Sequence, residues 1–192
     1  SCMTEGFLKL GGQTVVIDEK RQLGHFKGRD EVIYLGNKEE LIDWMGAASA
    51  FEEKEPGKNR QETEETKTGI FVSDLESLCH FIYGSGDKRE EKIIFWEQIA
   101  KREKKGWFLA GIYNPVGNME AAGTTFFREA LRQQQGICLG GNVGLQRVLD
   151  FDDLGYANQN KNLPPGIGCF KEGAGSRTRK LLLPVFDLGN RH

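Results

Sequence analysis

The stretch GIFVSDLE, residues 69–76, carries the clearest structural signal in the chain. Residues 69–73 form an apolar run of the length of a buried strand, and Asp74 follows where a helix would begin. Leu75, Leu78 and Ile82 then recur at helical spacing. We therefore expect a buried strand, a sharp turn at Ser73 and Asp74, and an amphipathic helix.

Strand and helix signals alternate on both sides of this stretch. Upstream, QTVVID at residues 13–18 is a β-branched run that ends in an acid, which is typical of a buried strand. The alternation predicts an α/β fold with a largely parallel sheet that is flanked by helices on both faces. We expect strands at residues 13–18, 31–35, 69–73, 107–114, 136–139, 169–171 and 180–186, and helices capped by Asn37, Asp74, Asp87 and Thr124 or Thr125.

Length and composition indicate a single globular domain. The chain has 192 residues, of which 38% are hydrophobic and 28% charged. We expect one domain at residues 4–192, and we leave the opening Ser-Cys-Met out of the fold. Residues 52–67 contain no apolar side chain apart from Pro56, so we expect a mobile charged loop at residues 52–68.

Composition also excludes several classes of protein. No run approaches the roughly 18–20 apolar residues of a membrane span, and no charged-then-apolar leader is present, so we expect no membrane contact by this segment. The 28 acids and 26 bases leave a net charge of −2, which argues against a broad nucleic-acid surface. The four cysteines form no CxxC pair, which argues against a zinc site and favours reduced, buried thiols.

The chain lacks the motifs of a complete nucleotide site. No G-x-x-x-x-G-K-[ST] segment is present, and the one Gly-Lys step, Gly57-Lys58, is followed by Asn59. Residues 69–74 resemble a Walker B strand, in which an apolar run delivers acids to a metal and a water. Aligned on Leu75, the first acid falls at Ser73, which cannot be an anionic ligand, and the second is Asp74.

Ser73 and Asp74 are therefore the candidate nucleotide-site residues, at a degenerate Walker B position. The alternative for Asp74 is a helix cap. We predict no catalytic residue and no metal site. For the other polar candidates, a structural role as loop, helix-surface or solvated-turn residues is favoured over a catalytic or binding role. These candidates are the glycine-rich run at 140–144, the basic run at 101–105, His25, His80, His192, Asp150, Asp152 and Asp153.

The order of these motifs resembles the distal half of FtsK/SpoIIIE-type P-loop ATPase domains. It is most similar to the C-terminal ATPase module of the EssC/EccC-type coupling proteins of type VII secretion. Gly111-Ile112 matches a GIH-like strand, Arg128 falls in the next helix, and the 165–168 run matches a terminal PGRG turn with Ile167 in place of arginine. The resemblance covers residues 13–186 and implies a degenerate RecA-like P-loop ATPase scaffold.

The resemblance also implies a function. It points to a catalytically inactive C-terminal module that acts in substrate or partner recognition or in regulation. Its implied partners are WXG100-type secreted proteins or neighbouring ATPase modules, and its implied location is the cytoplasmic part of a membrane-anchored parent protein. ATP and Mg²⁺ would be ligands of the parent, and this chain needs no cofactor. The alternative is a fragment of an active FtsK-type translocase whose Walker A lies outside this stretch.

A third class is a DNA-translocase accessory domain. It would need a basic face built from Lys101, Arg102, Lys104 and Lys105. Basic residues near the end of a helix complement the helix dipole, which is the simpler explanation of this cluster. The net charge also counts against DNA binding.

Overall fold

A computed structural model describes residues 2–53, 67–114, 121–146 and 148–182. The chain divides into two compact units, Ser1–Tyr113 with Met119–Ala130, and Asn114–Asn118 with Leu131–His192. Most of the expected charged loop, residues 54–66, lies outside the described residues. Each unit has its own sheet and is described by itself.

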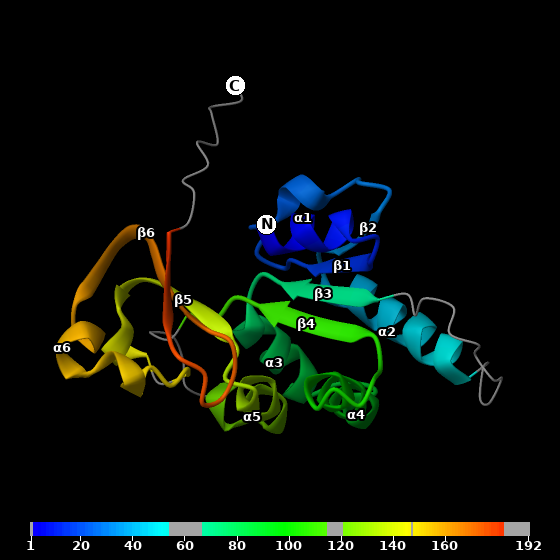
Figure 1. The fold of residues 1–192 in the computed structure, drawn as a ribbon. Coiled ribbons are helices and arrows are strands. Elements are labelled where there is room, and N and C mark those ends of the chain that lie inside the picture. Colours follow the sequence, from blue (N-terminus) through cyan, green and yellow to red (C-terminus); the bar gives the residue numbers. More distant parts are fainter. Residues whose placement is uncertain (1, 54–66, 115–120, 147, 183–192) are drawn as a thin grey trace. The chain divides into compact units, whose positions relative to one another are not determined.

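The first unit is built around a four-stranded parallel sheet in the order β2-β1-β3-β4, which confirms the predicted fold class (Figure 1). β3 is buried at all five positions because it pairs with a neighbour on each side and is covered on both faces. The strands are β1 (Gln13–Ile17), β2 (Val32–Leu35), β3 (Thr68–Val72) and β4 (Trp107–Gly111), and the helices are α1 (Cys2–Lys9), η1 (Gly24–Phe26), α2 (Lys38–Glu53), α3 (Leu75–Tyr83), α4 (Arg89–Ala100), η2 (Ala121–Gly123) and α5 (Thr125–Arg132).

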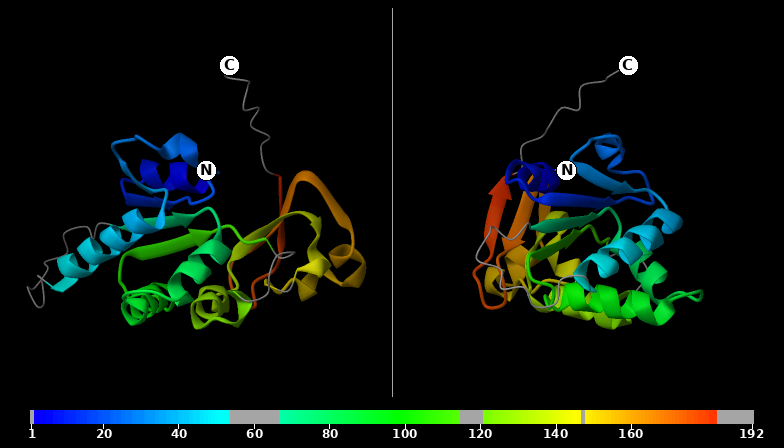
Figure 2. Two further views of the ribbon diagram at one scale, coloured as in Figure 1. Left: turned by 180° about the vertical axis from the view of Figure 1, so that it is seen from behind. Right: turned by 90° about the vertical axis from the view of Figure 1, so that its right-hand side faces the viewer.

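Helices cover both faces of this sheet, with α1 on one face and α2, α3 and α4 on the other (Figure 2). On the α1 side, the rings of Phe7, Phe71 and Phe108 meet with centroids 5.8–6.2 Å apart. On the opposite side, Trp96 is fully buried, and its indole N–H donates to the sulfur of Met45 at 3.2 Å. Aromatic side chains therefore fill both layers of the core.

Three of the predicted helix caps are confirmed. The Asn37 side chain accepts from the backbone N–H of Glu40 at 2.9 Å, and Asp74 accepts from that of Glu76 at 3.0 Å. Thr124 accepts from the backbone N–H of Phe127 at 3.3 Å. These residues stop the preceding turn and satisfy N–H groups that a helix start leaves open.

The predicted cap at Asp87 is wrong. α4 begins one residue later, and its N-cap is Lys88, which has a left-handed φ of 56° and makes no side-chain cap hydrogen bond. Asp87 and Glu90 have the spacing of a capping box. The left-handed backbone of Lys88 places the start of α4 at Arg89, so Asp87 lies one residue before the N-cap.

α1 was not anticipated, and it begins inside the residues that the sequence analysis left out. Phe7 and Leu8 of α1 pack against the buried cluster of Val16, Leu23, Phe26 and Phe71. The apolar residues of this helix are too few to predict a helix from the sequence. Their role becomes clear only in the folded chain, where they pack against the sheet. No helix of the described residues is long and apolar enough to cross a membrane.

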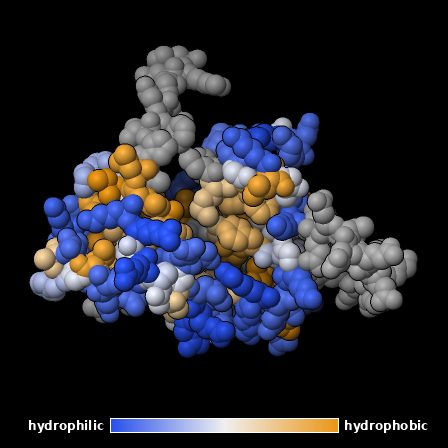
Figure 3. Space-filling view, in the orientation of Figure 1, coloured by the Kyte–Doolittle hydropathy of each residue, from blue (hydrophilic) through white to orange (hydrophobic). Residues whose placement is uncertain are grey.

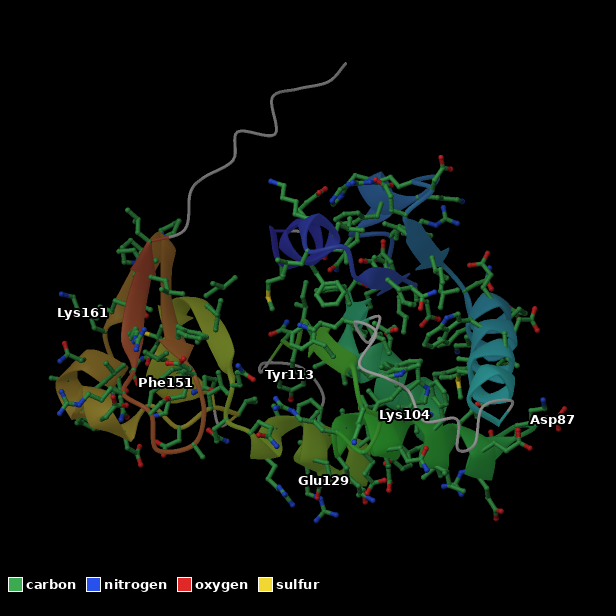
Figure 4. All side chains as sticks on the ribbon, turned by 45° about the vertical axis from the view of Figure 1, so that its right-hand side comes forward. Asp87, Lys104, Tyr113, Glu129, Phe151 and Lys161 are labelled. Carbon is green, nitrogen blue, oxygen red and sulfur yellow. The ribbon has the colours of Figure 1, made fainter. Side chains whose placement is uncertain are left out.

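The second unit is a three-stranded antiparallel sheet in the order β5-β6-β7. Phe151, labelled in Figure 4, is buried with Val143 and Cys169 in the core of this unit. Its elements are β5 (Gly136–Asn142), η3 (Val143–Leu145), η4 (Asp152–Leu154), α6 (Tyr156–Gln159), β6 (Asn162–Lys171) and β7 (Arg179–Leu182).

These later strands do not join the parallel sheet. β5 and β6 are joined by residues 143–161 and pair with each other in antiparallel register, so they form a separate sheet with β7. The expected turn at 163–168 is part of β6, and Pro164 and Pro165 fall between its paired residues Leu163 and Gly168. Residues 183–186 of the last expected strand lie outside the described residues.

Candidate functional site

The candidate site lies in the first unit at the carboxyl ends of β1 and β3. These two parallel strands are neighbours, and Ile17 pairs with Val72 at the last register position. In open α/β sheets, ligands bind at this edge, where the connections leave neighbouring strands in opposite directions. A small pocket opens there, lined by Ile17, Leu35, Ser73, Asp74, Ser77 and Phe81 among others.

The pocket as it stands has about 20 Å³ of space. That is room for one water molecule and far too little for a nucleotide. Much of its lining is apolar, from Leu35, Leu41, Leu78 and Phe81.

Asp18 is the most heavily bonded carboxylate of the site. It follows β1 directly and is fully buried. Its oxygens accept from the backbone N–H groups of Gln22 and Leu23 at 2.8 and 2.7 Å and from the Tyr34 hydroxyl at 2.8 Å. The Ser73 hydroxyl also donates to it. Burial alone would raise the pKa of Asp18, but the hydrogen bonds from Ser73, Tyr34 and the two N–H groups hold that pKa below its ordinary value.

Ser73 is therefore part of the internal network. Its side chain is nearly inaccessible, and its backbone N–H donates to the carbonyl of Ile17 at 2.9 Å. The hydroxyl ties the end of β3 to the carboxylate at the end of β1. This contact gives the serine a structural partner at the position where the Walker B alignment would place a metal-binding acid.

The Asp74 carboxylate is likewise bound by neighbouring groups of the chain. Besides capping α3, it accepts from the Ser77 hydroxyl at 2.9 Å and forms an ion pair with Lys20. Its side chain is 14% exposed, whereas that of Lys20 is 55% exposed. Burial raises the pKa of Asp74, but the Lys20 ammonium, the Ser77 hydroxyl and the Glu76 N–H outweigh burial and lower it.

The tyrosine of this network is protonated at neutral pH. Burial and the hydrogen bond to Asp18 raise the pKa of Tyr34 to about 12. The phenol therefore acts as a donor to the carboxylate. Asp18 is hydrogen-bonded and Asp74 is hydrogen-bonded and ion-paired by other groups of the chain. These contacts stabilise the carboxyl ends of β1 and β3.

Sequence reasoning missed Asp18, Lys20 and Tyr34. A usable signal existed, since QTVVID was identified as a strand that ends in an acid. Lys20 and Tyr34 carry no such signal, because neither belongs to a motif and only the pairing of β1 with β2 and β3 brings them to the site.

The other sequence candidates lie elsewhere. His80 is exposed on α3, and Arg128 is exposed on α5. The Asp150 carboxylate accepts from the backbone N–H of Asp152, as in the expected turn, while Asp153 binds Thr178 and Lys171. Among the described residues, no three His, Cys, Asp or Glu side chains gather to hold a metal ion. His192 lies outside the described residues.

The basic run after α4 is largely engaged as well. α4 ends at Ala100, so these residues follow the last turn. Lys101 pairs with Glu97 at 3.4 Å. The ammonium of Lys104, labelled in Figure 4, lies 4.9 Å from the ring centroid of Phe95 and 5.5 Å from that of Trp107.

Comparison with solved structures shows a similar fold in the ATPase domains of EssC and EccC and in a conjugation coupling protein. ATPases 2 and 3 of EssC from Geobacillus thermodenitrificans match with a TM-score of 0.65 and 19% identity over 94% of this chain and 33% of that chain. ATPases 2 and 3 of Thermomonospora curvata EccC, in complex with a signal sequence peptide, match with a TM-score of 0.59 and 19% identity over 90% of this chain and 30% of that one.

A third match is the monomer form of the pCW3 conjugation coupling protein TcpA with ATPγS, with a TM-score of 0.52 and 18% identity over 97% of this chain and 56% of that one. No protein-family model matches the sequence, and no curated protein does. The predicted resemblance to EssC, EccC and FtsK-like proteins is confirmed, and at these identities it is a resemblance of fold. The chain spans about a third of the length of the EssC and EccC structures.

Proposed function

We propose that this chain is an ATPase-like module of the type VII secretion coupling class that does not hydrolyse ATP. The ion pair between Lys20 and Asp74 carries the proposal. Asp74 is the acid left at the degenerate Walker B position, and an ammonium group of the chain's own occupies it. ATP hydrolysis needs a metal ion and a positioned water, and both oxygens of Asp74 already contact groups of the chain.

Two further observations support inactivity. Ser73 donates to Asp18 and is nearly inaccessible. The sequence contains no G-x-x-x-x-G-K-[ST] segment to cradle phosphates. These observations support the proposal, because Ser73 and Asp74, which stand at the degenerate Walker B position, are engaged by other groups of the chain.

The proposed role is recognition or regulation within a larger secretion protein. EccC, whose fold this chain shares, is named as a type VII secretion ATPase, and one EccC structure holds a signal sequence peptide. We propose WXG100-type secreted proteins or neighbouring ATPase modules as partners, and a place in the cytoplasmic part of a membrane-anchored parent protein. Phe108 in β4 and Ile112 directly after it are exposed apolar side chains that are available for such contacts. Figure 3 shows hydrophobic residues at the surface of one face of the molecule.

The test is calorimetry and phosphate release with Mg-ATP on the 192-residue chain. We expect neither tight binding nor turnover, and the same result for Lys20→Met, because freeing Asp74 restores only one of the missing parts. Stoichiometric nucleotide binding with turnover that Asp74→Asn abolishes would overturn the proposal.

A second candidate function is a fragment of an active FtsK-type translocase whose Walker A lies elsewhere in the protein. The position of Asp74, at the carboxyl end of β3 beside β1, favours it. A longer native chain that hydrolyses ATP, and loses this activity with Asp74→Asn but keeps it with the exposed control Asp30→Asn, would establish this alternative.

A further inference from the structure

Two cysteines stand directly opposite each other in the second unit. The antiparallel register of β5 and β6 pairs Cys138 with Cys169. Residues paired in this way project to the same face of the sheet. Cys138 accordingly packs against the core cluster that contains Cys169.

The spacing of such a pair suits a disulfide. Directly opposed residues of an antiparallel pair have Cα atoms about 4.5–5.5 Å apart, and disulfides span about 4.4–6.8 Å between Cα atoms. A register irregularity lies between Leu139 and Gly141, immediately beyond this position. Bulges bend and twist a ladder locally, so small adjustments of the two Cβ atoms are available there.

The two thiols differ in accessibility. Cys169 is fully buried, whereas Cys138 is partly exposed. A small oxidant therefore meets Cys138 first, and Cys169 is held behind it as the nearest second sulfur. Accessibility of one thiol and a resolving thiol beside it are two features of oxidation-sensitive cysteine pairs, and a low pKa, which increases the rate of oxidation, is the third.

We propose that Cys138 and Cys169 form a cross-strand dithiol that peroxides oxidise to an intramolecular disulfide. The Cys138 sulfur attacks hydrogen peroxide, takes one oxygen to become a sulfenic acid and releases water. The Cys169 sulfur then attacks the Cys138 sulfur, a second water leaves, and the S–S bond forms. Two thiols and one peroxide thus yield one disulfide and two waters, with peroxide as the two-electron oxidant.

The surroundings make this a slow site at neutral pH. Burial raises the pKa of both thiols, and their mutual proximity adds to this for Cys138. Around Cys169, the Lys180 ammonium of β7 lowers its pKa and the Asp153 carboxylate raises it. The pair stays reduced in an ordinary cytosol and responds to sustained oxidant, which fits the transient disulfides of reducing compartments.

The test is a peptide map of the folded chain after treatment with hydrogen peroxide. Non-reducing trypsin digestion should release residues 133–147 (QQQGICLGGNVGLQR) joined to residues 162–171 (NLPPGIGCFK), with a mass lower by two hydrogen atoms than the sum of the two peptides. In the folded chain this crosslink should exceed any other cysteine pairing by at least about tenfold, because only these two thiols are positioned against each other, and in urea that selectivity should disappear. In urea we expect pairing with Cys2 and Cys79 as well.

Variants separate this site from the other thiols. Cys79→Ala should leave the crosslink intact, because Cys79 is buried in the first unit. Cys169→Ala should stop oxidation of Cys138 at the sulfenic or sulfinic acid. The peptide map of the unchanged chain tests the proposal even if one of these variants fails to fold.

Two outcomes would overturn the proposal. One is free thiols in both peptides after the peroxide has oxidised the methionines, and the other is the same mixture of cysteine pairings in the folded and the urea-treated chain. The proposal is independent of the proposed function, since nucleotide binding and partner binding do not enter the assay.

Discussion

Asp18 shows how the surroundings of one side chain decide what it can do. A carboxylate at the end of a parallel strand is well placed to bind a ligand. Here four hydrogen-bond donors of the chain surround it, and no solvent reaches it. The carboxylate therefore links β1, which it follows, to Tyr34 of β2 and to Ser73 at the end of β3 through hydrogen bonds.

Replacing this carboxylate should be costly. In Asp18→Asn, an amide NH₂ would face groups that are themselves donors, so we expect the free energy of unfolding to fall by about 2–4 kcal/mol. Urea denaturation followed by circular dichroism measures the loss. The exposed control Asp30→Asn should stay within about 0.5 kcal/mol of the unchanged chain, and an equal loss in both variants would contradict this account.

The same residue predicts a pH dependence. The pKa of Asp18 is lower in the folded chain than in the unfolded one, so its stabilising contribution is fully present above about pH 4. It is lost as the pH falls through the folded pKa. The stability difference between the unchanged chain and Asp18→Asn should therefore shrink as the pH falls below about 4. A difference that stays constant as the pH falls below about 4 would show that folding does not lower the pKa of Asp18.

Lys20 should control the titration of Asp74. Because its ammonium is the largest influence that lowers the pKa of Asp74, Lys20→Met should raise that pKa toward its ordinary value. Carboxyl ¹³C NMR titration detects the change directly. Lys38→Met is the matched control, because Lys38 is also exposed and pairs with Glu19 instead. An unchanged pKa in Lys20→Met would mean that the ion pair does not form in solution.

At the scale of elements, close packing of α1 on β3 explains a glycine inside a buried strand. A Cβ placed on Gly69 would lie 2.7 Å from the Phe7 ring and 2.9 Å from the Phe71 ring. Glycine weakens a strand and often marks a close approach of this kind. The benefit at Gly69 is that the α1 aromatic ring can rest on the sheet.

Two glycine-to-alanine changes should therefore have opposite effects. Gly69→Ala should lower the free energy of unfolding by about 1–3 kcal/mol, because the rings must move. Gly6→Ala, within α1, meets no atom within 4 Å and should raise it by about 0.5–1 kcal/mol through better helix propensity. Thermal unfolding of the two variants measures these changes. A Gly69→Ala variant as stable as the unchanged chain would show that α1 does not pack against β3 in solution.

At the scale of the whole molecule, the prediction of one domain at residues 4–192 stays a prediction. The second unit is small, and a sheet of three strands with few buried side chains is marginal by itself. α5 runs through the boundary, because Ala130 belongs to the first unit and Leu131 to the second. We therefore expect the two units to unfold together.

Tryptophan fluorescence can test this coupling, since Trp44, Trp96 and Trp107 all lie in the first unit. Phe151→Ala removes a core side chain of the second unit and should lower stability by about 3–5 kcal/mol. If the units are coupled, the tryptophan transition shifts to lower urea. The control Tyr156→Ala, at an 83% exposed position, should leave it in place. An unshifted transition in Phe151→Ala would mean two independent domains.

Local signals alone determined the α/β class, most of the parallel strands and the caps at Asn37, Asp74 and Thr124. Each of these depends on a few neighbouring residues, through hydrophobic period or hydrogen bonds within one turn. The contacts between Lys20 and Asp74, between Ser73 and Asp18 and between Cys138 and Cys169 could not be predicted from local signals. Those contacts depend on which strands pair and in what register, and the free energy that selects a pairing is spread over the whole core.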